Sequence, residues 1–146
     1  MPRVLIAITA CVRDCQNGTV QALRDTWLQD VAKYPTATYR IFIGDGTPTG
    51  ENEEPLRAMA KGAHDANRGI NYEEKCKTGD AQPAAYTPKS DEVALPVPDS
   101  YFHLVFKTRA MHKWALENGF DFVFKVDCDT YVDVDRLMHS GFEQHD

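Results

Sequence analysis

The sequence predicts an α/β protein built around a mainly parallel sheet. Residues 4–12 form a continuous apolar run with β-branched members, which is typical of a fully buried strand. A helical pattern and a second apolar run follow within the first 46 residues, so the chain opens with a β-α-β unit and hence with parallel strands. Helix and strand alternate again over residues 101–126. A length of 146 residues suits a single domain.

The first strand and the segment after it are defined by local signals. Residues 4–12 are too short, and too weakly basic at their start, for a signal peptide, so a strand is expected there. A polar loop is expected over residues 13–18. A helix is then expected over residues 19–33, with Thr19 as its N-cap. Its apolar residues recur at helical spacing: Val20, Leu23, Trp27, Leu28 and Val31.

The second strand is expected over residues 39–43, after Tyr34-Pro35 ends the helix. The turn Gly44-Asp45-Gly46 follows it. The segment 45–98 is then predicted to be an irregular insertion or lid, because it holds six of the eight prolines and many small polar residues. Within it, a helix is expected over residues 56–66 and a loop over residues 75–89.

Regular structure is expected again after Pro98. Asp99 or Ser100 is expected to cap a helix over residues 101–117, and Asn118-Gly119 has the pattern of a helix C-terminus. Residues 120–126 are expected to form a third strand. The Asp127-Cys128-Asp129 triplet follows, and a short helix is expected over residues 133–140.

The triplet Asp127-Cys128-Asp129 is the first candidate site. In an extended chain the two carboxylates face the same side and Cys128 faces the other. Ligands of open α/β sheets bind outside the carboxyl ends of strands, where this triplet is expected. Two hard oxygen donors suit Mn²⁺ or Mg²⁺, with phosphate oxygens and water completing the coordination. A polar loop with solvated acids is the alternative interpretation.

Arg24 and Lys107 are the second candidates, because each lies on or beside the apolar stripe of its helix. A cation in such a place needs a carboxylate or phosphate partner. One interpretation is that both face the same cleft as the two aspartates and hold a diphosphate. The other is that they reach the surface or form structural salt bridges.

Thr9, Ala10 and Asp45 complete the set of candidates. They follow strands at their expected carboxyl ends, where α/β proteins commonly bind a base or a ribose. The sequence has no glycine-rich phosphate loop, which excludes a classical dinucleotide or P-loop site. The five histidines form no pair at metal-ligand spacing and are expected to be surface or packing residues.

Four blocks in order resemble the β-1,3-galactosyltransferase and Fringe family of glycosyltransferases. They are residues 22–27 (ALRDTW), like the family's R-x-T-W helix; residues 40–44 (RIFIG), like its second strand; residues 99–108 (DSYFHLVFKT), like its D-S-Y-x-N-L-x-x-K-T; and residues 124–132 (FKVDCDTYV), like its K-x-D-D-D-x-[FY]-V. The chain departs from the family at Cys128, which replaces the middle aspartate, and at His103, where the family prefers asparagine.

The resemblance implies a GT-A-like (Rossmann-like) fold, truncated relative to the family, that binds a UDP-sugar with Mn²⁺ or Mg²⁺. Transfer of a hexose to a sugar hydroxyl with inversion, of the β-1,3 type, would follow. Asp129 would be the direct metal ligand, and Asp127 would lie near the ribose or in the metal's water shell. Thr9, Ala10, Arg24 and Lys107 would line the nucleotide pocket. The family's catalytic base follows the triplet at a distance, and this chain ends 17 residues past Asp129, so no catalytic base is named.

A non-catalytic module that binds a nucleotide-sugar or a glycan is therefore the alternative function. The expected partners are a nucleotide-sugar donor and a glycan acceptor, with a homo-oligomer or a second chain supplying the remaining half. The net charge of −6 argues against nucleic-acid binding through bulk positive charge. No apolar run spans a bilayer, and without a signal peptide the expectation is a cytoplasmic protein with free cysteines, in keeping with a bacterial or viral setting.

Overall fold

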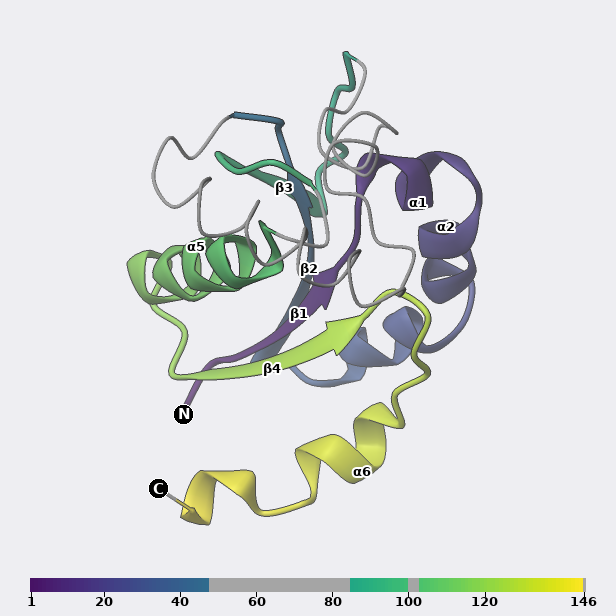
Figure 1. Cartoon of the computed structure of the whole chain (residues 1–146). Coiled ribbons are helices and arrows are strands. Elements are labelled where there is room, and N and C mark those ends of the chain that lie inside the picture. Colours follow the sequence, from purple (N-terminus) through teal and green to yellow (C-terminus); the bar gives the residue numbers. More distant parts are fainter. Residues whose placement is uncertain (48–84, 100–102, 146) are drawn as a thin grey trace, which may run out of the picture.

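The computed structural model describes residues 1–47, 85–99 and 103–145. Its centre is a sheet of four parallel strands in the spatial order β3-β2-β1-β4 (Figure 1). The strands are β1 (Val4–Thr9), β2 (Ala37–Gly44), β3 (Glu92–Leu95) and β4 (Phe122–Asp127). This parallel sheet with flanking helices confirms the predicted α/β class.

Helices cover both faces of the sheet. One face carries α1 (Val12–Gln16), α2 (Thr19–Arg24), the 3₁₀ helix η1 (Trp27–Lys33) and α6 (Val134–Met138). The other face carries α5 (Leu104–Glu117), which lies across the sheet from α1 and α2 in Figure 1. A short 3₁₀ helix, η4 (Phe142–Gln144), follows α6. The fold is therefore a three-layer α/β/α arrangement.

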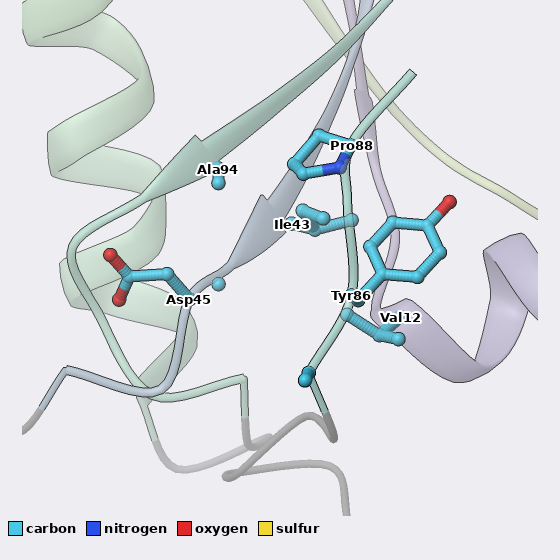
Figure 2. A pocket seen from close by; sticks show the side chains of 8 residues that line it. Val12, Ile43, Asp45, Tyr86, Pro88 and Ala94 are labelled. Carbon is cyan, nitrogen blue, oxygen red and sulfur yellow. The ribbon is translucent and has the colours of Figure 1, made fainter.

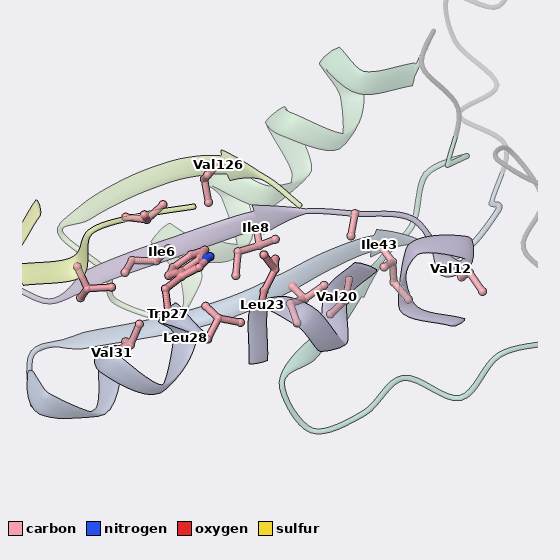
Figure 3. Packing of buried hydrophobic residues seen from close by; sticks show 14 residues of the cluster. Ile6, Ile8, Val12, Val20, Leu23, Trp27, Leu28, Val31, Ile43 and Val126 are labelled. Carbon is pink, nitrogen blue, oxygen red and sulfur yellow. The ribbon is translucent and has the colours of Figure 1, made fainter. Parts of the chain in front are cut away.

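Strand β1 lies at the centre of the core because its side chains are buried on both faces. Ile6 and Ile8 pack against α2 and η1, where Trp27 fills much of the layer (Figure 3). Leu5 and Ala7 point the opposite way, toward α5. This double burial explains the continuous apolar run, since a strand covered on both faces does not alternate between apolar and polar residues.

The first strand is shorter than predicted, and the expected polar loop contains a helix. β1 ends at Thr9, and α1 begins three residues later, at Val12. The backbone N–H of Cys11 donates to the Asp14 carboxylate at 3.0 Å, and the N–H of Asp14 donates to the Cys11 carbonyl at 3.0 Å. A carboxylate three residues into a turn thus closes it in the manner of a capping box.

The helix predicted over residues 19–33 is interrupted. α2 ends at Arg24, and η1 starts at Trp27. The Thr26 hydroxyl donates to the carbonyl of Ala22 at 2.7 Å, which competes with a continuing helical ladder. The prediction of Thr19 as N-cap is also wrong, because Gly18 occupies that position with φ +93°. The apolar spacing was correctly identified nonetheless, since Val20, Leu23, Trp27, Leu28 and Val31 are all buried.

The segment 45–98 contains a strand that the sequence did not predict. β3 pairs in parallel with the carboxyl half of β2, from Ile41 opposite Glu92 to Gly44 opposite Leu95. The description of 45–98 as an irregular insertion is therefore wrong for residues 92–95. The predicted helix 56–66 and most of the predicted loop 75–89 lie outside the described residues.

The carboxyl-terminal elements follow the predictions closely. α5 spans Leu104–Glu117 and is followed by Gly119 with φ +72°, as the Asn118-Gly119 pattern indicated. The third predicted strand is β4, and α6 begins after Asp133, whose side chain caps it. Asp99 is not a helix cap; its carboxylate binds Lys107 instead. Ser100 lies outside the described residues.

No helix in the described parts of the chain is long and apolar enough to cross a membrane.

Candidate functional site

The carboxyl ends of β1 and β4 meet at the point where the strand order reverses. The chain runs outward from β1 to β2 and β3 and then returns to place β4 on the other side of β1. In the register, Thr9 lies opposite Asp127. The backbone N–H of Cys128 donates to the Thr9 carbonyl at 3.2 Å, which fixes the two strand ends to each other. This is the place where open α/β sheets bind ligands.

The Asp127-Cys128-Asp129 triplet forms a turn rather than an extended segment. The N–H of Thr130 donates to the Asp127 carbonyl at 3.2 Å and closes the turn. The premise of strand alternation is therefore wrong beyond Asp127. The two carboxylates nevertheless lie apart from Cys128, as predicted, because Asp127 and Asp129 are exposed while Cys128 is half-buried against the core.

The two aspartates offer oxygen donors suited to a hard divalent cation. The Asp127 side chain is 65% exposed, and one of its oxygens accepts a hydrogen bond from Lys125 Nζ at 3.1 Å. Asp129 is exposed at the same turn. Within residues 1–47, 85–99 and 103–145, no group of three or more His, Cys, Asp or Glu residues is arranged to hold a metal. A cation held here would need oxygens from a ligand or water, which is how Mg²⁺ commonly binds beside phosphates.

Three half-buried cysteines lie in or near the turn: Cys128 within it, and Cys11 and Cys15 at the start of α1 and within it. Burial, together with hydrogen bonding to Asp14, raises the pKa of the Cys11 thiol to about 11. Burial, followed by the charge of Asp14, raises the pKa of Cys128 to about 12. Burial and the charge of Glu92 raise the pKa of Cys15 to about 12. All three are free thiols, as expected, and at neutral pH they are protonated and poor nucleophiles.

A pocket of about 230 Å³ opens beside the carboxyl end of β2. Figure 2 shows Pro88 and Tyr86 on one side of it, Ala94 and Asp45 on the other, and Ile43 between them. The Tyr86 ring is held in place because its hydroxyl donates to Glu92 at 2.7 Å. The walls are mostly apolar, so the pocket suits a flat ring. Asp45 lies at its edge, where one carboxylate oxygen accepts a hydrogen bond from the Thr47 N–H at 2.8 Å.

Lys107 reaches the end of β1 from the α5 face. Its ammonium donates to the Ala10 carbonyl and pairs with Asp99. The Lys107 and Asp99 side chains are 6% and 3% exposed. Burial raises the pKa of Asp99, and the nearby Lys107 charge partly opposes that rise. Lys107 therefore fixes the loop after β1. The Thr9 hydroxyl beside that loop is buried and has no hydrogen-bond partner among the described residues.

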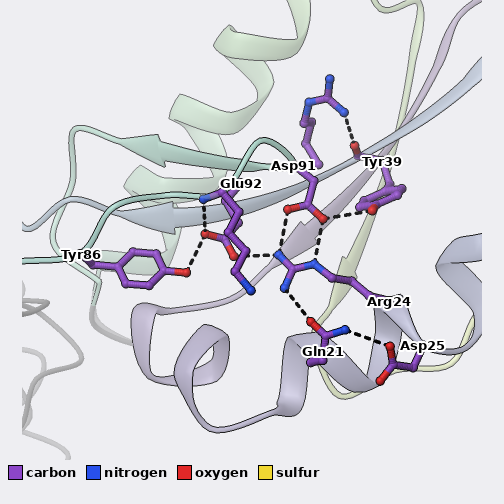
Figure 4. Close-up of polar contacts among 9 residues, drawn as sticks. Gln21, Arg24, Asp25, Tyr39, Tyr86, Asp91 and Glu92 are labelled. Atoms are coloured by element: carbon purple, nitrogen blue, oxygen red, sulfur yellow. Dashed lines mark hydrogen bonds and ion pairs between the residues drawn. The ribbon is translucent and has the colours of Figure 1, made fainter.

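Arg24 lies on the opposite face of the sheet, in a polar cluster with Asp91 and Glu92 at the start of β3 (Figure 4). Its guanidinium binds Asp91 through two hydrogen bonds of 2.8 Å and Glu92 through a third of 2.8 Å. The Tyr39 hydroxyl donates to Asp91 at 3.0 Å. Burial raises the pKa values of Asp91 and Glu92. Hydrogen bonds from Arg24 and Tyr39 to Asp91, and from the Lys89 N–H, Arg24 and Tyr86 to Glu92, outweigh it, so both pKa values lie below their usual range.

The predicted site residues are thus brought together only in part. Thr9, Ala10, Asp127 and Asp129 gather at the switch point between β1 and β4. Asp45 lies one strand away, at the end of β2. Arg24 and Lys107 come from opposite faces, and each is engaged by carboxylates. The salt-bridge interpretation of both cations is what the structure shows.

The sequence did not identify Asp14, Asp91 or Glu92 as partners. Asp14 stands three residues after Cys11 just before a polar stretch, a spacing that signals a helix start. Asp91 and Glu92 carry no such signal, because their partner Arg24 is more than 60 residues away in the sequence. His103, expected to be a surface or packing residue, is buried, with only 1% of its surface exposed.

No protein-family model matches this sequence, and no curated protein is significantly similar to it. The resemblance to the β-1,3-galactosyltransferase and Fringe family therefore stays a prediction that depends on the four ordered blocks.

Proposed function

We propose that the chain binds a nucleoside diphosphate sugar with a divalent cation and acts as a metal-dependent hexosyltransferase of the inverting, β-1,3 type. One observation carries this proposal. The switch point of a parallel sheet holds two exposed aspartates, Asp127 and Asp129, on a turn tied to the end of β1. That position and that donor set suit a cation–diphosphate pair.

The neighbouring surfaces support the same ligand. The pocket between Tyr86, Pro88 and Ile43 is wide enough for a base, and Asp45 at its edge can accept from a ring N–H. The loop Thr9–Ala10, held by Lys107, lies at the end of the strand between that pocket and the aspartates. When bound, Mn²⁺ or Mg²⁺ would offset the charge of the departing diphosphate.

Calorimetric titration of UDP with and without Mn²⁺ tests the proposal. We expect Mn²⁺ to strengthen UDP binding, and Asp129→Ala to weaken the Mn²⁺-dependent binding at least about tenfold. Asp30→Ala is the matched control, because Asp30 is a surface carboxylate on η1 paired with Lys33 at 2.9 Å. UDP affinity that is unchanged by the metal and by Asp129→Ala would contradict the cation site.

A nucleotide-sugar or glycan binding module without turnover is the second candidate. The observation in its favour is that Arg24 and Lys107 are already paired with carboxylates. Arg24 and Lys107 would then give little help in opposing the charge of a leaving diphosphate, which reduces the expected contribution to catalysis.

An assay of UDP release from several UDP-sugars separates the two candidates. Release that requires Mn²⁺ and is lost in Asp129→Ala supports the enzyme. Mn²⁺-dependent binding of UDP with no release, in the presence of candidate acceptors, supports the binding module.

A further inference from the structure

Two cysteines from different strand ends converge on one carboxylate. The Cys11 thiol donates to Asp14 Oδ2 at 3.1 Å. Burial is the main cause of the raised pKa of the Cys128 thiol, and the charges of the same Asp14 and of Cys11 add to it. Both thiols therefore lie within electrostatic reach of one carboxylate group, although 117 positions separate them in the sequence (128 minus 11).

The backbone holds this pair in place. Thr9 and Asp127 are register partners on adjacent parallel strands, which lie about 4.8 Å apart. Cys11 stands two residues beyond Thr9 and Cys128 one residue beyond Asp127, and the Cys128 N–H is bound to the Thr9 carbonyl at 3.2 Å. Disulfides form between residues whose Cα atoms lie about 4.4–6.8 Å apart, and the spacing of the two strands that lead to Cys11 and Cys128 falls within that range.

Cys15 offers an internal comparison. It lies one helical turn after Cys11, in α1, and is also half-buried. Its electrostatic and hydrogen-bonding neighbours are Glu92 and Tyr86, on the side of β3. Of the three described cysteines, Cys11 and Cys128 are therefore the two that share a neighbour.

We propose that Cys11 and Cys128 are an intramolecular disulfide pair that joins the ends of β1 and β4 across the switch point. The oxidant is a small-molecule disulfide such as oxidised glutathione. The small fraction of Cys11 that has lost its proton to solvent attacks one sulfur of the oxidant, and one glutathione thiolate leaves. Cys128, also deprotonated, then attacks the Cys11 sulfur of the mixed disulfide, and the second glutathione leaves. Two protein thiols are oxidised, and one glutathione disulfide is reduced to two thiols.

The bond would lock the turn that carries Asp127 and Asp129 to the loop that follows β1. It would also remove the hydrogen bond that the Cys11 thiol donates to Asp14 at the start of α1. The pair therefore connects the oxidation state of the chain to the geometry of the candidate site, and its existence does not depend on the proposed function.

Non-reducing peptide mapping tests the pair directly. The folded protein is equilibrated with excess oxidised glutathione, quenched with acid and digested with trypsin. Each cysteine falls in its own tryptic peptide: residues 4–13 hold Cys11, 14–24 hold Cys15, 76–77 hold Cys76 and 126–136 hold Cys128. We expect the linked peptides 4–13 and 126–136 to exceed any other cysteine pairing about tenfold, because proximity gives this pair the highest effective concentration.

Matched variants and a second readout complete the test. Cys15→Ser is expected to leave the linked species unchanged, and Cys11→Ser and Cys128→Ser are expected to abolish it. Oxidation of the unsubstituted protein should raise Tm by about 10 °C, because the bond closes a long loop of the unfolded chain. Glutathione adducts alone, a dominant pairing through Cys15 or Cys76, or an unlinked Cys11 and Cys128 would each overturn the proposal.

Discussion

The buried pair of Lys107 and Asp99 gives a prediction whose size follows from the structure. Lys107→Met keeps most of the side-chain volume but removes the only ammonium that pairs with Asp99 within the described residues. The Asp99 side chain is 3% exposed, so water cannot replace the lost partner. Breaking a buried ion pair from one side costs about 3–5 kcal/mol, and we expect a loss of that size in the free energy of unfolding at pH 7.

The stability cost of Lys107→Met should also depend on pH, because that cost arises from the charge of Asp99. Burial raises the pKa of Asp99 in the folded protein above its value in the unfolded chain. The neutral carboxyl group therefore stabilises the fold fully below the unfolded-state pKa, and this contribution is lost as the pH rises through the folded-state pKa. Without Lys107, only hydrogen bonds from the backbone N–H groups of Gly44 and Val12 oppose that rise, so the pKa of Asp99 goes still higher. The penalty of Lys107→Met should therefore shrink as the pH falls from 7 toward about 4, near the usual pKa of an aspartate.

Urea unfolding at several pH values measures both effects. Lys113→Met is the matched control on the same helix, because Lys113 and Glu117 are 76% and 60% exposed and 3.7 Å apart, a geometry that contributes at most about 1 kcal/mol. The double variant Asp99→Asn/Lys107→Met removes both charges and should recover part of the loss. A cost for Lys107→Met equal to that of Lys113→Met, or one that is independent of pH, would refute the reasoning.

Three further substitutions test contacts elsewhere on the sheet. Arg24→Met leaves Glu92, whose side chain is 0% exposed, without its cation, so urea unfolding should show a loss of about 3–5 kcal/mol at pH 7. The difference in unfolding free energy between Arg24→Met and the unsubstituted protein should narrow in acid. The pKa of Glu92 is lowered in the folded state, so its contribution to stability is lost as the pH decreases through that pKa. Gly44→Ala puts a Cβ 2.5 Å from the Val97 carbonyl oxygen and 3.0 Å from the Asp99 Cβ, so thermal melting should show a loss of about 1–3 kcal/mol; an unchanged Tm would contradict this. Lys125→Ala removes the ammonium 3.1 Å from Asp127, so calorimetry with UDP present should show Mn²⁺ binding up to about fivefold tighter, and equal or weaker binding would be the contrary result.

The parts of the fold that the sequence predicted are those with local or periodic signals. The apolar run of β1, the helical spacing of α5 and the Asn118-Gly119 terminus each depend on neighbours within a few residues. Such signals survive in any tertiary context, because they reflect burial on both faces of a strand or the left-handed conformation that glycine permits. Their agreement with the structure is what identified the α/β class.

The unpredicted parts depend on partners far away in the chain. β3 is four residues long and begins with Glu92, a charged residue whose burial is compensated by Arg24 from α2 together with the Tyr86 hydroxyl and the Lys89 N–H. Neither β-propensity nor alternation marks such a segment as a strand. Arg24 was predicted to bind a diphosphate, and in the structure it binds carboxylates. Either partner supplies the negative charge that a partly buried guanidinium needs. A sequence alone does not distinguish them.

The pairing of both cations changes what the candidate site requires of its ligand. Arg24 and Lys107 are neutralised by carboxylates on opposite faces of the sheet. The edge that would receive a diphosphate instead exposes Asp45, Asp127 and Asp129, with Lys125 bound to one of them. An anion that approaches carboxylates without a cation is repelled. If the proposed function is correct, UDP should bind very weakly in the absence of Mn²⁺ or Mg²⁺. The gain in UDP affinity on adding the metal should also be larger than it would be at a site where Arg24 and Lys107 were free to bind the diphosphate.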